Sequence, residues 1–135
     1  MKKSVLRIAV VAAAVASLVA GCANTPREFD RQQSPDDKLP SYVEAVRELD
    51  PASTRLAGER DGVQYFIGMD ARSYAICLAI VNPAHPDDTG SGCADGGMVG
   101  VGSGTGSARF YRAGMADLAV PDGWVALTRE VIVKK

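Results

Sequence analysis

The sequence predicts a mainly β domain, a small α+β fold in which an antiparallel sheet of about five to six strands follows one short N-terminal helix. Three observations support this fold class. Asp61-Gly62 stands between two strand-like segments, and the apolar run Tyr74–Val81 suits a central strand. Pro121-Asp122-Gly123 has the composition of a turn before two further strand-like segments, Trp124–Leu127 and Glu130–Val133.

A short helix is expected over residues 41–49, directly before the strands. Ser41 and Glu44 are spaced as a capping box, in which the two residues satisfy free backbone N–H groups of the first turn. Asp50-Pro51 ends the helix, because the residue before proline avoids the helical region. The apolar residues fall near one helical face: Tyr42, Val43, Val46 and Leu49.

The segments Thr54–Arg60 and Val63–Met69 are expected to form a hairpin. The Asp-Gly pair between them is a strong hairpin signal, because both residues tolerate the positive φ of a two-residue turn. Such a turn pairs Gly58 with Tyr65 and Leu56 with Ile67 across the two strands. The Tyr65 ring is then expected to cover the bare backbone at Gly58.

The next strand is expected over Tyr74–Val81 and is buried on both faces, because the run is continuously apolar. Strand alternation puts the bulky side chains on one face: Tyr74, Ile76, Leu78 and Ile80. Cys77 lies on the opposite face, among smaller side chains. Residues 82–92 form a loop that contains His85, the only histidine of the chain.

Glycine dominates residues 94–106, which are expected to form a flexible surface loop or an irregular strand. Pro121-Asp122-Gly123 has the composition of a turn. Further strands are expected at 108–113, 115–120, 124–127 and 130–133.

The N-terminus has the pattern of an export signal. Basic residues precede Ile8–Ala20, an apolar stretch of 13 residues. A transmembrane helix needs about 20 apolar residues, so this stretch fits a cleaved signal better than a permanent span. The sequence Val19-Ala20-Gly21-Cys22 resembles the lipobox of bacterial lipoproteins. The resemblance implies removal of residues 1–21 and a lipid on Cys22; an ordinary signal or an uncleaved anchor is the alternative.

This resemblance sets the expected organisation and location. Residues 22–40 are polar and rich in proline, and they are expected to form a lipidated, disordered tether. Residues 41–135 form a single small globular domain. The lipid on Cys22 makes the membrane a partner and places the protein outside the cytoplasm, on the cell membrane. In a bacterium with two membranes, Ala23 at the next position would permit sorting to the outer membrane.

The remaining cysteines are expected to pair, because disulfide bonds persist outside the cytoplasm. Closing the loop between Cys77 and Cys93 stabilises the fold by about 3 kcal/mol on a loop-entropy basis. A metal site made of His85 and both thiols is an alternative, although the spacing fits no compact metal motif. Free thiols are the third possibility.

Charge and motifs exclude several function classes. Residues 22–135 carry 12 Lys and Arg against 16 Asp and Glu, without the basic footprint that nucleic acid requires. The glycine run 96–106 lacks the lysine of a phosphate-binding loop and the spacing of a dinucleotide fold, so no cofactor is expected.

Individual polar and aromatic residues do not form a recognisable site. His85 and Ser103 are expected to be solvated loop residues. The alternative is a catalytic pair in which His85 is the base and Ser103 the nucleophile. Asp87, Asp88 and Asp95 lack the spacing of a calcium loop, and no metal site is expected. Core packing is the expected role of the aromatic residues, with a ligand platform as the alternative: Trp124, Tyr42, Tyr65 and Tyr74.

A second resemblance covers residues 54–133. Several scattered features carry it: Arg55-Leu56-Ala57-Gly58-Glu59, Asp61-Gly62-Val63, Tyr65, Cys77-Leu78, Cys93 and Pro121-Asp122-Gly123-Trp124. They are similar to small exported lipoproteins of Actinobacteria that have no assigned activity. The resemblance implies a β-rich domain with two cysteines and brings no catalytic residue.

The sequence therefore favours a non-enzymatic domain that is anchored by lipid and binds or scaffolds an envelope protein or glycan. One alternative is an extracytoplasmic hydrolase with a site on loops, using Ser103 or a loop acid. The other is an inhibitor or accessory subunit of an envelope complex, which would expose an apolar patch.

Overall fold

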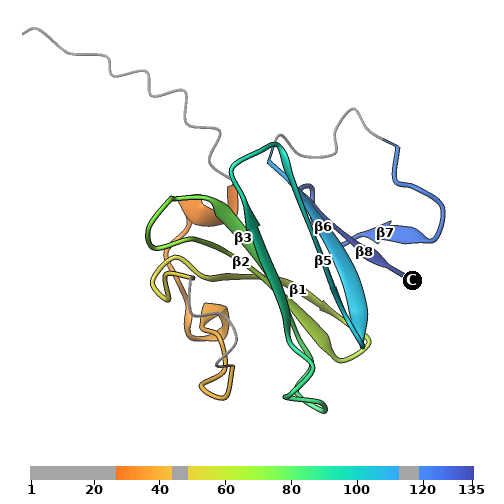
Figure 1. Ribbon diagram of the computed structural model, residues 1–135, viewed down its shortest axis with the longest axis horizontal. Helices are drawn as coiled ribbons and strands as arrows, with labels where there is room; N and C mark the ends of the chain where they lie inside the picture. The colour runs from red at the N-terminus through yellow and green to blue at the C-terminus, as the bar shows by residue number, and fades with distance from the viewer. Residues whose placement is uncertain (1–26, 44–48, 113–118) are drawn as a thin grey trace, which may run out of the picture.

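The computed structural model describes residues 27–43, 49–112 and 119–135. Within them the chain forms eight strands in two four-stranded antiparallel sheets, which confirms a mainly β fold (Figure 1). The expected single sheet of five to six strands is thus two sheets. The predicted helix lies partly outside these ranges, since residues 44–48 are not described. At its ends, Ser41 and Tyr42 form a turn and Leu49 pairs with Asp70.

The first sheet has the order β1-β2-β3-β4. Its strands are β1 (Arg55–Arg60), β2 (Val63–Met69), β3 (Ile76–Val81) and β4 (Gly90–Ala94). Asp61 and Gly62 have φ of 52° and 76°, as the predicted hairpin turn requires. The pairing of Gly58 with Tyr65 is confirmed. A register shift follows Leu56, which therefore faces Phe66 instead of Ile67.

Two details of this sheet differ from the expectation. Leu127, and not Tyr65, covers Gly58, where an added Cβ would lie 2.9 Å from Leu127 Cγ. Tyr74 precedes β3 and is 76% exposed, with φ of 59°. The Asp70 carboxylate accepts hydrogen bonds from the backbone N–H groups of Arg72 and Ser73, and this polar turn holds Tyr74 out of the strand.

The second sheet has the order β5-β6-β8-β7. Its strands are β5 (Met98–Ser103), β6 (Gly106–Tyr111), β7 (Trp124–Ala126) and β8 (Val131–Lys134). The glycine-rich run contributes a regular strand, because Val99 and Val101 face the core while glycines occupy the outer positions. The strand expected at 115–120 falls mainly outside the described residues, and residues 119–120 are not in a strand.

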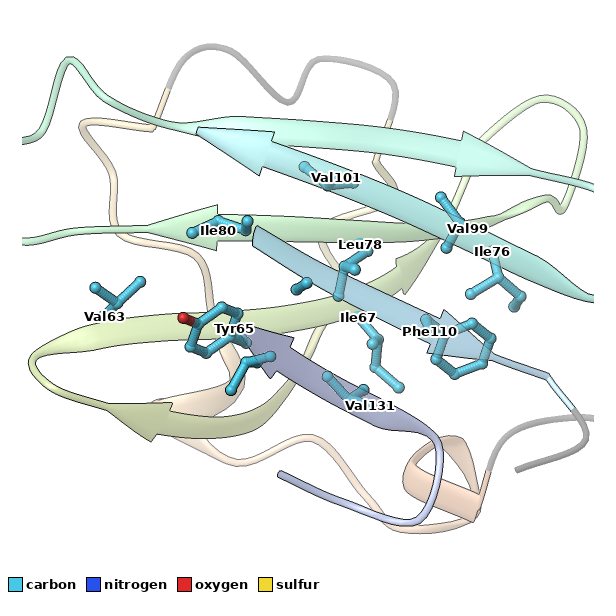
Figure 2. Packing of buried hydrophobic residues seen from close by; sticks show 12 residues of the cluster. Val63, Tyr65, Ile67, Ile76, Leu78, Ile80, Val99, Val101, Phe110 and Val131 are labelled. Carbon is cyan, nitrogen blue, oxygen red and sulfur yellow. The ribbon is translucent and has the colours of Figure 1, made fainter. Parts of the chain in front are cut away.

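The main core lies between the two sheets (Figure 2). It contains alternate side chains of β2, β3, β5, β6 and β8. Three of the four bulky residues that were expected to share a face of β3 belong to it: Ile76, Leu78 and Ile80. Its largest fully buried members are Phe110, Ile67, Leu78, Ile80, Val131 and Val133. The opposite face of β3, with Cys77, belongs to a second cluster that also contains Leu49, Phe66, Ala79 and Val81.

The two sheets meet closely at β4 and β5. An added Cβ at Gly90 would lie 2.6 Å from the Gly102 carbonyl oxygen, a backbone atom that cannot move aside alone. We expect Gly90→Ala to lower the free energy of unfolding by about 2 kcal/mol through this overpacking. Urea unfolding measures the change, and Gly97→Ala, where an added Cβ meets no atom within 4 Å, is the control. Equal loss in both variants would contradict the packing argument.

The N-terminal segment corrects the prediction of a disordered tether. Residues 27–40 contain the 3-10 turns η1 (Arg27–Asp30) and η2 (Pro35–Asp37) and lie against the first sheet. Asp37 is 1% exposed. Its carboxylate accepts hydrogen bonds from the Arg31 guanidinium at 2.6 Å, from Ser34 N at 2.7 Å and from Leu56 N at 2.9 Å. Residues 22–26 lie outside the described residues.

A second group of polar contacts fixes the same segment. The Gln33 side-chain amide donates to the carbonyl oxygens of Pro51 at 2.8 Å and Thr54 at 3.0 Å. The Arg55 guanidinium donates to the Arg31 carbonyl at 2.9 Å. Apolar content alone therefore underestimated the order of this segment, because hydrogen bonds between its side chains and the backbone hold it in place.

Candidate functional site

Three connections and the end of β8 gather at one end of the molecule, here called the loop end. They are the β1–β2 turn, the β3–β4 loop (82–89) and the β5–β6 turn (104–105). Gln64, near the start of β2, pairs with Val81 at the end of β3, and Ile80 of β3 pairs with Gly90 at the start of β4. These strand ends, and the connections that join them, therefore lie at the same end of the sheet. The loop end lies in the lower part of Figure 1.

The β3–β4 loop is tied to the β5–β6 turn by a hydrogen bond. Gly104 N donates to Asp88 Oδ1 at 2.7 Å. An added Cβ at Gly104 would lie 3.0 Å from Asp88 Oδ2, so this close approach favours glycine. The loop is also braced internally, because Ala84 N donates to Asn82 Oδ1 at 2.9 Å. These bonds give the loop end a defined shape.

A cleft of about 330 Å³, here called the basic cleft, opens between the β1–β2 turn and the β5–β6 turn. Its lining combines three cationic side chains with one acid, Asp61. The cations are Arg60, Lys134 and Lys135, and the hydroxyls are those of Tyr65, Ser103, Thr105 and Ser107.

Tyr65 forms the inner wall of the basic cleft. The residue is 3% exposed and belongs to the core, and burial raises the pKa of its hydroxyl. Figure 2 shows its oxygen at the end of the core where Val63 lies. Within the described residues this hydroxyl makes no hydrogen bond, although it is part of the cleft lining. It is therefore available to a bound molecule.

A second cleft, of about 570 Å³, lies on the other side of the β5–β6 turn. The β3–β4 loop supplies most of its lining, including His85, Asp87 and Asp88. Gly104 and Thr105 line both clefts, so the β5–β6 turn forms the ridge between them. The basic cleft and this acidic cleft are thus neighbours with opposite charge.

The structure separates the residues of the hypothetical catalytic pair. Ser103 lines the basic cleft and lies 3.2 Å from Thr105, hydroxyl to hydroxyl. His85 lines the acidic cleft, and no hydrogen bond in the described part of the chain joins its ring to a hydroxyl. Asp95 lies in the β4–β5 connection and lines neither of these clefts.

The metal alternative for the cysteines is wrong. Cys77 and Cys93 are directly paired across β3 and β4 and form the predicted disulfide bond. The Asp70 carboxylate lies within 4.8 Å of both sulfur atoms, but each sulfur is bonded to the other and is no thiolate.

The aromatic residues do not form one platform. Tyr65 is in the core, and Arg109 lies 4.3 Å from the centre of the Trp124 ring on the outer face of the second sheet. Tyr42 and Tyr74 are exposed elsewhere, at 43% and 76%.

Sequence reasoning missed the basic residues of the cleft. Arg60 precedes the predicted turn, whereas Lys134 and Lys135 follow the last predicted strand. Only the position of β8 beside β6 in the second sheet brings the lysines to the loop end. The Asp61-Gly62 signal predicted the turn that forms one wall of the basic cleft, whereas no sequence signal predicted that Lys134 and Lys135 lie in the same cleft.

The opposite end of the sandwich receives the N-terminal segment, which reaches it at η1 (Figure 1). Phe29 packs against the main core, and Glu28 lies close to Glu130, the residue before β8. Glu130 is 5% exposed. Burial raises its pKa, and the neighbouring charge of Glu28 raises it further.

This carboxyl pair gives a pH-dependent prediction. The pKa of Glu130 in the folded state lies above its ordinary value of 4.5. Protonation of this carboxyl therefore stabilises the folded state below pH 4.5, and this stabilisation is lost as the pH rises through the folded-state pKa. Glu130→Gln is therefore expected to be more stable than the wild type at pH 7, with a smaller difference at pH 4. Urea unfolding at both pH values measures this, and a pH-independent difference would contradict it.

No helix in the described ranges is long and apolar enough to cross a membrane. Comparison with known proteins finds no matching family model, no matching curated protein and no matching solved structure. The case for a function therefore depends on the sequence and on the geometry of this site.

Proposed function

We propose that this chain is a lipid-anchored protein of the bacterial cell envelope, with a non-enzymatic binding domain whose ligand site is the loop end. One observation carries the proposal. The N-terminal segment joins the domain at the end opposite the two clefts. An anchor at Cys22 therefore leaves the clefts on the side that faces away from the membrane.

The distance between the lipid and the domain is short. Four residues separate Cys22 from Arg27, the first residue of η1, so the two Cα atoms lie at most about 18 Å apart when the chain is fully extended. The chain from Arg27 onward is held on the domain through Phe29, Gln33 and Asp37. The domain therefore lies close to the headgroups, and lipoprotein modification supplies the two or more acyl chains that stable anchoring requires.

The composition of the loop end supports binding. The basic cleft offers hydroxyls and cations held by two hairpins and by β8. Binding sites of this kind on β-sandwiches are formed by loops that a rigid scaffold positions. An extracytoplasmic partner, either a glycan or a protein, reaches this end without passing the membrane.

Photo-crosslinking in intact cells tests the proposal. A photoreactive residue at position 105 lies on the ridge between the clefts, and one at position 74, in the exposed β2–β3 turn, lies at the opposite end. We expect the probe at 105 to capture an envelope glycan or protein that the probe at 74 does not capture. Identical products from both positions would contradict a ligand site at the loop end.

The anchor needs its own test. Wild-type protein is expected to stay in the membrane fraction after carbonate washing, whereas Cys22→Ser is expected to be released. If Cys22→Ser stayed bound to the membrane, lipid anchoring at this residue would be wrong. Reactivity toward a panel of esters, peptides and glycans that a cleft substitution abolishes would favour the hydrolase instead.

A further inference from the structure

We infer that the basic cleft binds an anionic, hydroxyl-rich ligand, a sugar or polyol that carries phosphate or carboxylate groups. The inference rests on the proposed function and names the ligand class of its site. Charge is the first argument. Three cations and one acid line this cleft, although the mature chain carries an excess of acidic residues. A local potential of this kind attracts anions.

Two of the three cations have no ion pair in the described ranges. Arg60 is ion-paired with Asp61, with 3.2 Å between Nε and Oδ2, and its buried Nε makes no hydrogen bond among the described residues. Lys134 and Lys135 are exposed, and no ion pair in the described ranges involves them. A guanidinium presents a planar fork to a phosphate or carboxylate, and the lysines add point charges beside it.

The hydroxyls supply the second half of the recognition. The Tyr65 hydroxyl lines the cleft and has no hydrogen-bond partner in the described part of the chain, whereas the residue as a whole is buried. The hydroxyls of Ser103 and Thr105 are bonded to each other, which leaves each with further capacity to donate or accept. Such groups match the hydroxyls of a sugar or polyol.

The neighbouring cleft limits where the anion binds. Asp87 and Asp88 line it, and they lie across the ridge from the basic cleft. Like charges repel, so an anionic group is confined to the side with the lysines. The remaining hydroxyls of an extended ligand can cross the ridge at Gly104 and Thr105.

Titration calorimetry of the full lipidated protein in nonionic detergent tests the ligand class. Four probes separate the possibilities: poly(glycerol phosphate), polygalacturonate, dextran and inorganic phosphate. We expect at least one charged polymer to bind at least tenfold more tightly than dextran and inorganic phosphate. Binding should weaken as salt rises, because exposed charges are screened. Tighter binding of poly(glycerol phosphate) identifies phosphate as the charged group of the ligand, and tighter binding of polygalacturonate identifies carboxylate.

Two variants and a matched control locate the binding. Lys134→Gln with Lys135→Gln is expected to weaken binding about fivefold, as for loss of two exposed charge contacts. Tyr65→Phe keeps the ring in the core and is expected to cost about fivefold, as for one hydrogen bond. Lys38→Gln with Arg72→Gln removes equal charge away from the cleft and is expected to leave affinity unchanged.

The two proposals fail in different ways. If no charged polymer binds better than dextran, or if the control pair weakens binding as much as the lysine pair, the anionic ligand class is wrong. A specific photo-crosslink at position 105 in the same protein would then leave the loop-end site standing. If that crosslink is also missing, the proposed function itself is wrong.

Discussion

Replacing Asp37 with alanine is expected to lower the free energy of unfolding by about 3 kcal/mol and to release the N-terminal segment from the first sheet. The carboxylate is 1% exposed and accepts hydrogen bonds from backbone N–H groups of Ser34 and Leu56 as well as from Arg31. Alanine would leave these donors, which are only partly exposed to water, without this acceptor. Urea unfolding measures the loss, and hydrogen exchange at Leu56 reports release of the segment.

Two comparisons isolate the role of this carboxylate. Asp36→Ala changes an exposed neighbour in the same 3-10 turn and is expected to alter stability little. The Arg31 guanidinium, followed by backbone hydrogen bonds, holds the pKa of Asp37 far below its ordinary value of 3.8. Because the pKa of Asp37 is lower in the folded state than in the unfolded chain, the ionised carboxylate stabilises the fold above pH 3.8. This stabilisation is lost as the pH falls below that value and through the folded-state pKa. If both alanine variants lost equal stability, the buried network would not hold the segment.

Short-range signals predicted the first sheet well. The Asp61-Gly62 turn adopts the positive φ values that its residues tolerate, and the alternation of β3 separates Cys77 from the bulky core face. In each case the information lies within a few neighbouring residues. The bulge after Leu56 was not predicted, because it depends on what packs against β1 from elsewhere in the fold.

Long-range pairing explains what could not be predicted. The two sheets divide between β4 and β5, and β8 lies between β6 and β7 in the second sheet. Strand composition does not specify such neighbours. The same placement brings Lys134 beside Ser107 in the basic cleft. The segment 27–40 has only two large apolar residues, Phe29 and Leu39, and was expected to be disordered, yet polar contacts from Gln33 and Asp37 also hold it. Hydrophobic patterns do not report such contacts.

Removing the disulfide bond by Cys77→Ala with Cys93→Ala is expected to lower the free energy of unfolding by about 3 kcal/mol, on the basis of the loop entropy of the unfolded chain. The bond spans a sequence separation of 16 and joins residues that already pair across β3 and β4. β4 packs beside β5 through Gly90 and Gly92 and leads from the loop that binds Gly104. A looser β4 should therefore also weaken ligand binding at the loop end.

Urea unfolding of the double variant and of reduced wild type separates the covalent bond from packing. Cys77 is fully buried, so alanine at this position also removes a packed sulfur atom, whereas reduction keeps both sulfur atoms in place. Most of the loss is expected in the reduced wild type, because the cross-link constrains the unfolded chain. If reduction left stability unchanged while the double variant lost about 3 kcal/mol, packing at Cys77 would be the source of the stabilisation.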